Sequence, residues 1–187
     1  MNPITHFLVG WVALERTVVA RRDKALICLA GVVPDLDGLG LLVDAANRAL
    51  SRPETNCYQD WHRLIAHGLP AALAFALLAV ALARDRGRVA LFAFVAVHLH
   101  LLCDLLGSRG TTAEDIWPIW YLSPLTMSPV WSWSGQWPLV GWQNMLISIA
   151  LIGLTCWRAM NHGYSLVSLF STRADRVFVE TLRRWRS

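Results

Sequence analysis

Long apolar stretches alternate with short polar turns along most of this chain. A helix that crosses a bilayer needs about 20 mostly apolar residues. Five stretches approach this length, and we predict that each forms a transmembrane helix: 3–20, 24–43, 64–83, 89–107 and 138–157. The first stretch carries Glu15, and the second is interrupted by Asp35 and Asp37. The pattern predicts an all-α polytopic membrane protein with about five membrane helices.

The composition supports a membrane protein. Hydrophobic residues make up 55% of the 187 positions and charged residues 16%, with a mean hydropathy of +0.41. A soluble domain has about 25% charged residues, and a disordered chain has low hydrophobicity. Both classes are therefore excluded. The net charge of +4 does not indicate a nucleic-acid partner here, because basic residues in an apolar chain set its orientation in the bilayer.

The basic residues predict which side of the membrane each turn occupies. The turn after the first stretch, the turn at 84–88 and the region from Arg158 onward together hold 13 of the 17 Lys and Arg residues. Cytoplasmic loops are enriched in Lys and Arg. We therefore place the N-terminus outside and the C-terminus in the cytoplasm of a bacterial inner membrane. The sequence predicts no particular oligomeric state.

Two outer segments and the C-terminal tail complete the predicted organisation. Residues 44–62 are expected to form one loop, and 108–137 a longer one rich in tryptophan. Indole rings favour the membrane interface, so the longer loop is either an aromatic belt or a platform for a lipid substrate. Residues 1–162 are predicted to form the membrane-embedded domain. Residues 163–187 form a basic amphipathic tail suited to an anionic inner leaflet.

Ionisable residues within the predicted spans gather at one depth. An ionisable side chain inside a membrane is costly and points to a function. Four predicted helices, which run alternately inward and outward, each bring His or Asp to the outer leaflet. These residues are His6, Asp35, Asp37, His62, His67, His100 and Asp104. The alternative is a buried polar network that only ties the helices together.

The residue types and spacings predict a metal site. His100 and Asp104 are four residues apart, so they share one helix face. Pro34 breaks regular hydrogen bonding beside Asp35 and Asp37, which allows both carboxylates to turn inward. Imidazole and carboxylate without thiolate favour Zn²⁺, or else Mn²⁺ or Mg²⁺, and seven ligands are enough for two ions. His98 faces away from His100 and is predicted to be a packed core residue.

Four short motifs resemble those of the YdjM-type family of membrane-bound, metal-dependent hydrolases, some of which are LexA-regulated inner-membrane proteins. They occur in the family's order: Thr5-His6, Gly31-Val-Val-Pro-Asp-Leu-Asp37, His62-Arg-Leu-Ile-Ala-His67 and His100-Leu-Leu-Cys-Asp104-Leu-Leu-Gly-Ser-Arg-Gly110. The resemblance covers about residues 1–125. One departure is Gly68, where the family commonly has serine. The H-x-x-x-D pattern is also distantly similar to zinc-dependent phospholipase C, which implies attack of water on a phosphate ester.

These features predict a metal-dependent hydrolase that acts on a phosphate ester of a membrane lipid. Asp35 and Asp37 are candidates for the general base as well as metal ligands. Arg63 and Arg109 are candidates for phosphate recognition, although either could equally be an interface residue. A divalent-metal transporter would also place His and Asp within helices, but it needs a polar path to the cytoplasmic side. A structural or partner-binding membrane protein would need no metal.

Overall fold

The computed structural model describes residues 1–186 and is almost entirely helical. Its helices are α1 (Pro3–Leu14), α2 (Arg21–Ala30), the 3₁₀ helix η1 (Val33–Leu39), α3 (Gly40–Ala49), α4 (Cys57–Leu64), α5 (Leu69–Leu82), α6 (Arg86–Gly107), α7 (Trp142–His162), the 3₁₀ helix η2 (Leu166–Leu169) and α8 (Thr172–Arg186). Two short antiparallel strands, β1 (Ile119–Trp120) and β2 (Val130–Trp131), form a ribbon. The all-α fold class is confirmed.

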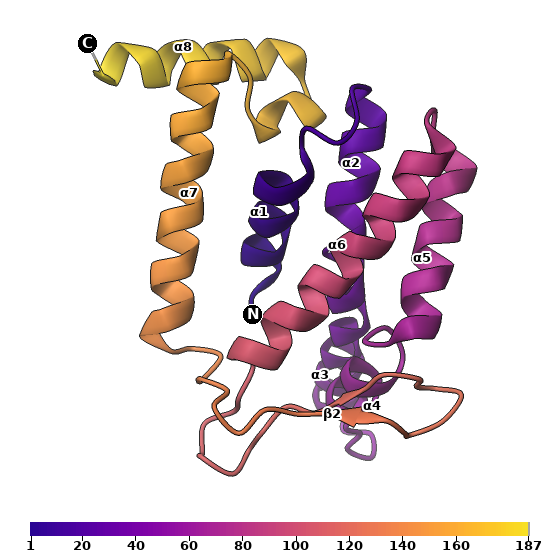
Figure 1. Ribbon diagram of the computed structural model, residues 1–187. Coiled ribbons are helices and arrows are strands. Elements are labelled where there is room, and N and C mark those ends of the chain that lie inside the picture. The colour runs from indigo at the N-terminus through magenta and orange to yellow at the C-terminus, as the bar shows by residue number, and fades with distance from the viewer. Residues whose placement is uncertain (187) are drawn as a thin grey trace.

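Five of these helices form one bundle, in which neighbouring segments of the chain run in opposite directions. Figure 1 shows α1, α2, α5, α6 and α7 side by side, with α8 lying across one end and the segment 108–137 crossing the other. The basic turns and the tail therefore gather at the α8 end. Both candidate metal-site motifs on η1 and α6 lie towards the opposite end.

Small residues allow the helices to approach closely. Ala72, Ala76 and Ala79 of α5 are buried in the same cluster as Ala93 and Ala96 of α6. Side chains of this size let two helix backbones pack tightly, which is the arrangement that membrane helices favour. This packing fixes α6, which carries two of the predicted metal ligands.

The number of membrane-spanning helices stays a prediction. Among residues 1–186, only α6 is long and apolar enough to cross a bilayer alone. A second span is formed if α2 is joined to the segment 33–49, from which it is bent by 52°. This break lies next to Pro34, as the sequence suggested. The helices α1 and α5 are apolar but shorter.

The first predicted span is shorter in the structure because its second half leaves the helix. α1 ends at Leu14, and the chain turns before α2 begins at Arg21. Glu15 follows the helix end and is buried, with a carboxylate oxygen 3.3 Å from Nη1 of Arg158 on α7. A buried charge needs such a partner, so this ion pair holds the end of α1 against α7.

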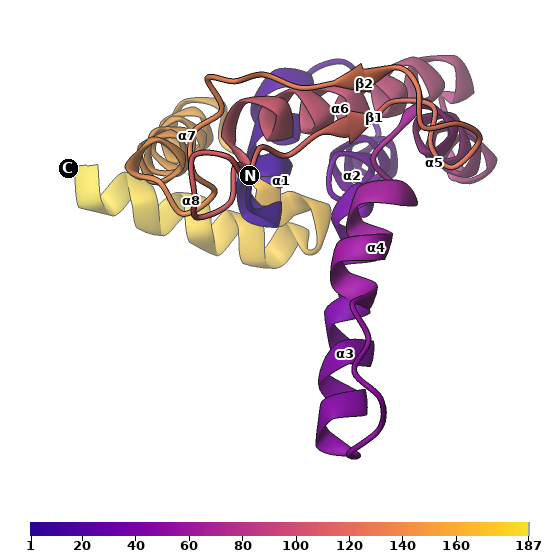
Figure 2. The same ribbon diagram turned by 90° about the horizontal axis from the view of Figure 1, so that it is seen from below.

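The prediction of a single loop over 44–62 was wrong. Residues 40–49 and 57–64 form α3 and α4, which contact each other. Figure 2 shows both projecting from the bundle, with α4 next to it and α3 at the outer end. Asp44 joins the two helices, because its carboxylate accepts hydrogen bonds from the backbone N–H groups of Cys57 and Tyr58. The predicted helix over 64–83 correspondingly begins later, at Leu69.

The tryptophan-rich segment is anchored to the bundle by a buried glutamine. The amide nitrogen of Gln136 donates to the carbonyl of Asp104 at 2.9 Å, and its side-chain oxygen accepts from the backbone N–H of Trp117 at 2.7 Å. The segment therefore closes over the end of α6. This contact also places Trp117 next to the polar cluster described below.

Candidate metal centre

Histidine and aspartate side chains from five parts of the chain converge beneath the tryptophan-rich segment. They form two groups in which one potential ligand atom of each residue lies within 4.8 Å of the others. The first group is His6, Asp35, His100 and Asp104, and the second is Asp35, His62 and His67. Asp35 belongs to both groups, so one carboxylate could bridge two ions.

The start of α1 places His6 in the first group. The side chain of Asn2 accepts the backbone N–H of Thr5 and caps the helix, and Pro3 suits its first turn. The cap sets the direction of α1 and buries His6 completely against α6, where its ring stacks on His100 at 3.8 Å between centroids. Nε2 of His6 lies 3.2 Å from Oδ1 of Asp104.

The helix α6 supplies a matched imidazole and carboxylate, as the spacing predicted. Nε2 of His100 lies 3.0 Å from Oδ2 of Asp104. The opposite nitrogen, Nδ1, is 2.9 Å from the carbonyl oxygen of Gly31, to which it donates. Ser108 donates to Oδ1 of Asp104 at 2.8 Å, and the Met1 amine also contacts this oxygen. All these atoms are buried, so His100 and Asp104 are held in fixed orientations.

The 3₁₀ helix η1 turns its two carboxylates towards different partners. Asp35 points towards the first group, with Oδ1 3.8 Å from Nε2 of His100. Asp37 accepts hydrogen bonds from Nδ1 of His62 at 2.6 Å and from Nδ1 of His67 at 3.1 Å, and from the backbone of Ala66. In a metal site, a carboxylate at this position orients the histidines through their second nitrogen. Asp37 belongs to neither ligand group, so we assign it this orienting role.

The remaining two histidines lie on either side of the end of α4. His62 is on α4, and His67 is in the turn before α5. The start of α4 lies very close to the junction of η1 and α3, which brings His62 next to η1. Only glycine fits at position 40, because a Cβ there would lie 2.5 Å from the carbonyl oxygen of Cys57. Nε2 of His67 reaches to 3.5 Å from Oδ2 of Asp104 and thereby connects the two groups.

The donor set fits divalent metal ions. In His62, His67 and His100 the Nδ1 atom is occupied by a carboxylate or carbonyl acceptor. The Nε2 atoms of neutral imidazoles then carry lone pairs suited to a cation. Among the described residues, Nδ1 of His6 and Oδ2 of Asp35 are buried without a hydrogen-bond partner. Orphaned buried acceptors of this kind are expensive unless a ligand satisfies them.

His67 also shows how strongly the cluster attracts positive charge. This residue lies in the turn between α4 and α5. It is therefore outside the candidate membrane spans, which are α6 and the segment formed by α2 with residues 33–49. Burial alone lowers its pKa, but hydrogen bonds and charge from Asp104 and Asp37 raise the pKa from 6.5 to about 9. In the absence of metal, His67 therefore carries a proton at neutral pH. A divalent cation would meet the same field of carboxylates after displacing this proton.

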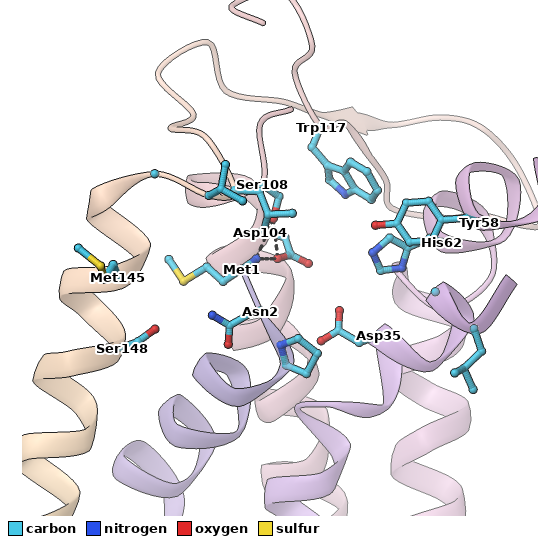
Figure 3. A pocket seen from close by; sticks show the side chains of 16 residues that line it. Met1, Asn2, Asp35, Tyr58, His62, Asp104, Ser108, Trp117, Met145 and Ser148 are labelled. Carbon is cyan, nitrogen blue, oxygen red and sulfur yellow. Dashed lines mark hydrogen bonds and ion pairs between the residues drawn. The ribbon is translucent and has the colours of Figure 1, made fainter. Parts of the chain in front are cut away.

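A cavity of about 730 Å³ opens beside the metal centre. Asp35, His62 and Asp104 line one side of it, together with Tyr58 and Trp117. Figure 3 shows the carboxylates of Asp35 and Asp104 directed into a shared space, with α7 across from them. Ligand cavities commonly measure about 300–1,000 Å³, so this space is large enough for a small-molecule ligand.

The two predicted arginines differ in what the structure shows. Arg109 follows α6, where its backbone pairs with Trp137 and Leu139, but it does not line the cavity. The side chain of Arg63 lies outside the described residues. Neither role in phosphate recognition is tested, and both stay predictions.

His98 lies apart from both ligand groups. Its Nδ1 is 2.8 Å from the carbonyl oxygen of Phe94, and its Nε2 is 2.9 Å from the hydroxyl of Tyr121. His98 is half-buried and both of its ring nitrogens have partners, so its role as a packed core residue stays a prediction.

Several residues around the site were not identified from the sequence. Tyr58 and Trp117 both pack on His62, with ring centroids 5.2 and 5.1 Å away. Ser108 and Gln136 fix Asp104 through its side chain and its backbone. Of these, only Ser108 carried a usable signal, because it lies four residues after Asp104 on the same helix face.

Comparison with protein-family models gives a match over most of the chain. The family model described as YdjM inner membrane protein matches residues 1–178. No match was found among curated proteins or solved structures. The distant similarity to zinc-dependent phospholipase C therefore stays a prediction.

Proposed function

Because this chain belongs to the YdjM inner membrane protein family, we propose that it is a membrane-embedded, metal-dependent hydrolase that acts on a phosphate ester of a lipid. The observation that carries this proposal is the pair of His/Asp groups that share Asp35 at the wall of a cavity. The Nε2 atoms of His67 and His100 converge on each other and on the carboxylate of Asp104. A polar network that only ties helices together would also satisfy Nδ1 of His6 and Oδ2 of Asp35, which are buried without a partner among the described residues.

The proposed centre divides the work among its residues. His6, His100 and Asp104 would hold one ion, His62 and His67 a second, and Asp35 would contact both. Two bound divalent metal ions would acidify a water molecule and neutralise charge on a phosphoryl group. The donor set favours Zn²⁺ over Mn²⁺ or Mg²⁺. Oδ2 of Asp35 is buried without a hydrogen-bond partner among the described residues, and Asp35 lines the cavity. With Oδ1 contacting the ions, Oδ2 would accept the proton from the attacking water.

The expected position in the membrane follows from the two ends of the bundle. The tryptophan-rich segment and the metal centre are at one end, and α8 with the basic turns is at the other (Figure 1). Lys and Arg favour the cytoplasmic side, so the metal centre would lie near the periplasmic leaflet. At the cytoplasmic end, α8 exposes Val177 and Trp185 among its arginines, which suits contact with an anionic leaflet.

The test is hydrolysis of lipid phosphate esters by protein purified in detergent. Protein loaded with Zn²⁺ or Mn²⁺ should release product from phosphatidic acid or phosphatidylglycerol, and treatment with a chelator should abolish the release. We expect His100→Ala to reduce the rate at least about a hundredfold. His98→Ala is the matched control, because His98 lies on the same helix but outside both groups, and it should keep most of the activity. Absence of hydrolysis by the metal-loaded protein, or equal loss in both variants, would contradict the proposal.

A further inference from the structure

We infer that the cavity beside the metal centre is entered sideways from the bilayer, between η1 and the start of α7, and that it receives the apolar chain of a lipid. This inference names the route and the shape of the substrate for the proposed function and rests on that function for the reaction. The binding of the lipid can be tested separately from hydrolysis.

The wall of the cavity away from the metal ligands is mostly apolar. Leu39 of η1 lies on one side of this wall, and Leu139, Val140 and Met145 around the start of α7 lie on the other. Figure 3 shows Met145 and Ser148 on α7 across the cavity from Asp35 and His62. One cavity thus joins charged metal ligands to an apolar surface, which matches a molecule with a phosphate at one end and a hydrocarbon chain at the other.

The apolar residues of this wall are exposed at the outside of the bundle. Leu39 is 54% exposed, Val140 88% and Met145 63%. In an inner membrane protein, large exposed apolar side chains at this level face lipid. The opening between them therefore leads into the bilayer.

An apolar track leads away from this opening along α7. Met145, Ile149 and Ile152 are spaced by four and three residues and are all exposed, so they form one stripe on the helix surface. The stripe begins at the mouth of the cavity and runs towards the middle of the bundle. A lipid chain lying on it would keep the phosphate at the level of Asp35 and Asp104.

The other approach to the metal centre is covered. The segment 108–137 crosses this end of the bundle (Figure 1), and Trp117 from that segment is 9% exposed and packs edge-on against His62. None of the described side chains that line the cavity belongs to Lys or Arg, and the Met1 amine that also lines it is paired with Asp104. The proposed metal ions would therefore neutralise most of the phosphate charge, and the hydrocarbon chain of the substrate would provide its attraction to the cavity.

The first experiment narrows the opening and compares two substrates with the same headgroup. We expect Met145→Trp to lower kcat/KM for dioleoyl phosphatidylglycerol in vesicles about tenfold or more, because the added ring fills the route of the chain. Met145→Trp should hydrolyse water-soluble dibutanoyl phosphatidylglycerol at nearly the same rate as the unchanged protein does. Leu146→Trp is the matched control: Leu146 is 56% exposed on the same helix but does not line the cavity, and both substrates should be unaffected.

The outcomes separate this inference from the proposed function. If Met145→Trp lowers kcat/KM equally for both substrates, or if Leu146→Trp has the same effect as Met145→Trp, the lateral route is wrong. The proposed hydrolase function would still stand in that case. If the unchanged protein hydrolyses neither substrate, the proposed function fails, and the route is judged by the second experiment alone.

The second experiment detects binding without hydrolysis. A long-chain alkyl phosphate with a photoreactive diazirine near the end of its chain is incorporated into vesicles with the metal-loaded protein. After illumination, we expect peptide mapping to find the label on η1 and on residues 139–152. An excess of unlabelled alkyl phosphate should prevent this labelling, and Met145→Trp should reduce the amount of label at least about fivefold. The inference would be overturned if unlabelled alkyl phosphate failed to displace the label from these segments. It would also be overturned if the displaceable label were found only elsewhere on the chain.

Discussion

The Nε2 atom of His100 lies 3.2 Å from the Nε2 atom of His67, although the two residues are 33 positions apart in the chain. The Nδ1 atom of each ring already donates to another acceptor, Gly31 in one case and Asp37 in the other. Two neutral rings held in this way would direct their lone pairs at each other. A proton on His67 relieves this conflict in the absence of metal, and a divalent cation would take its place.

Metal affinity is therefore expected to depend on pH. The pKa of His67 is raised to about 9, so binding below that pH must release its proton. We predict that the apparent affinity for Zn²⁺ rises about tenfold per pH unit between pH 7 and 9 and then levels off. Calorimetry in buffers with different ionisation enthalpies measures the released proton. An affinity that stays constant over this range would contradict the prediction.

The same pKa shift affects the stability of the protein without metal. A raised pKa means that the protonated form of His67 is favoured by folding. Its stabilising contribution is complete below the unfolded pKa, near 6.5, and is lost as the pH rises through about 9. Thermal unfolding of metal-free protein should therefore occur at lower temperature at pH 9.5 than at pH 6.5. Bound metal should reduce this difference, because it replaces the proton.

Asp37 provides a test of the orienting role. In Asp37→Asn, the side-chain oxygen can still accept from one histidine, but the amide nitrogen replaces the second acceptor. Loss of such an outer partner lowers metal affinity about 10–100-fold, and we expect that range here. Competition with a chelating indicator measures it. Asp60→Asn is the control, since Asp60 is exposed on α4 and belongs to neither ligand group; unchanged affinity in Asp37→Asn would refute the role.

The close approach of α4 to η1 predicts a specific effect of a small substitution. A Cβ at Gly40 would lie 2.5 Å from the carbonyl oxygen of Cys57 and 2.9 Å from the backbone nitrogen of Tyr58. Gly40→Ala should push α4 and His62 away from Asp35. We expect the binding free energy of one ion to weaken by about 1–3 kcal/mol. A metal titration would show this as weaker binding of the second of two ions.

The controls for this substitution are glycines with free space around them. A Cβ at Gly87 or Gly153 meets nothing within 4 Å, so Gly87→Ala and Gly153→Ala should leave both ions bound as before. Normal binding of two ions by Gly40→Ala would show that this contact does not position His62.

The sequence was most informative where local geometry determines the result. The four-residue spacing of His100 and Asp104 placed both on one helix face, and α6 confirms it. Alternating helix directions brought His6 to the same end as these two residues. Pro34 marked the break between α2 and the following segment, which the 52° bend shows. In each case the prediction depended only on helix periodicity, direction or a backbone constraint.

Features that depend on tertiary contacts were not accessible from the sequence. Asp35 and Asp37 are two residues apart and chemically identical, and only the position of α4 makes one a candidate ligand and the other an acceptor for two histidines. The residues 44–62 read as a loop because α3 and α4 are short and stabilise each other through Asp44. Met145 lies in a mostly apolar stretch, directly after Gln143 and Asn144, where no pattern distinguishes a cavity wall from a lipid-facing position.

The predicted orientation can be tested by labelling in intact cells. Single cysteines replace Asp85, in the turn before α6, and Glu114, in the segment 108–137, in a background without the native cysteines. We expect a membrane-impermeant maleimide to label Glu114→Cys directly and Asp85→Cys only after permeabilisation, because the basic turns should be cytoplasmic. The reverse pattern would place the metal centre at the cytoplasmic face.

The most direct measurement is the metal content of the purified protein by elemental analysis. The unchanged chain and His98→Ala should each retain close to two divalent ions per chain. His100→Ala and Asp104→Ala should lose at least one ion while remaining folded, as judged by helical circular dichroism. Absence of stoichiometric metal after loading with Zn²⁺ and Mn²⁺, or the same metal content in all four proteins, would contradict a metal centre built on these residues.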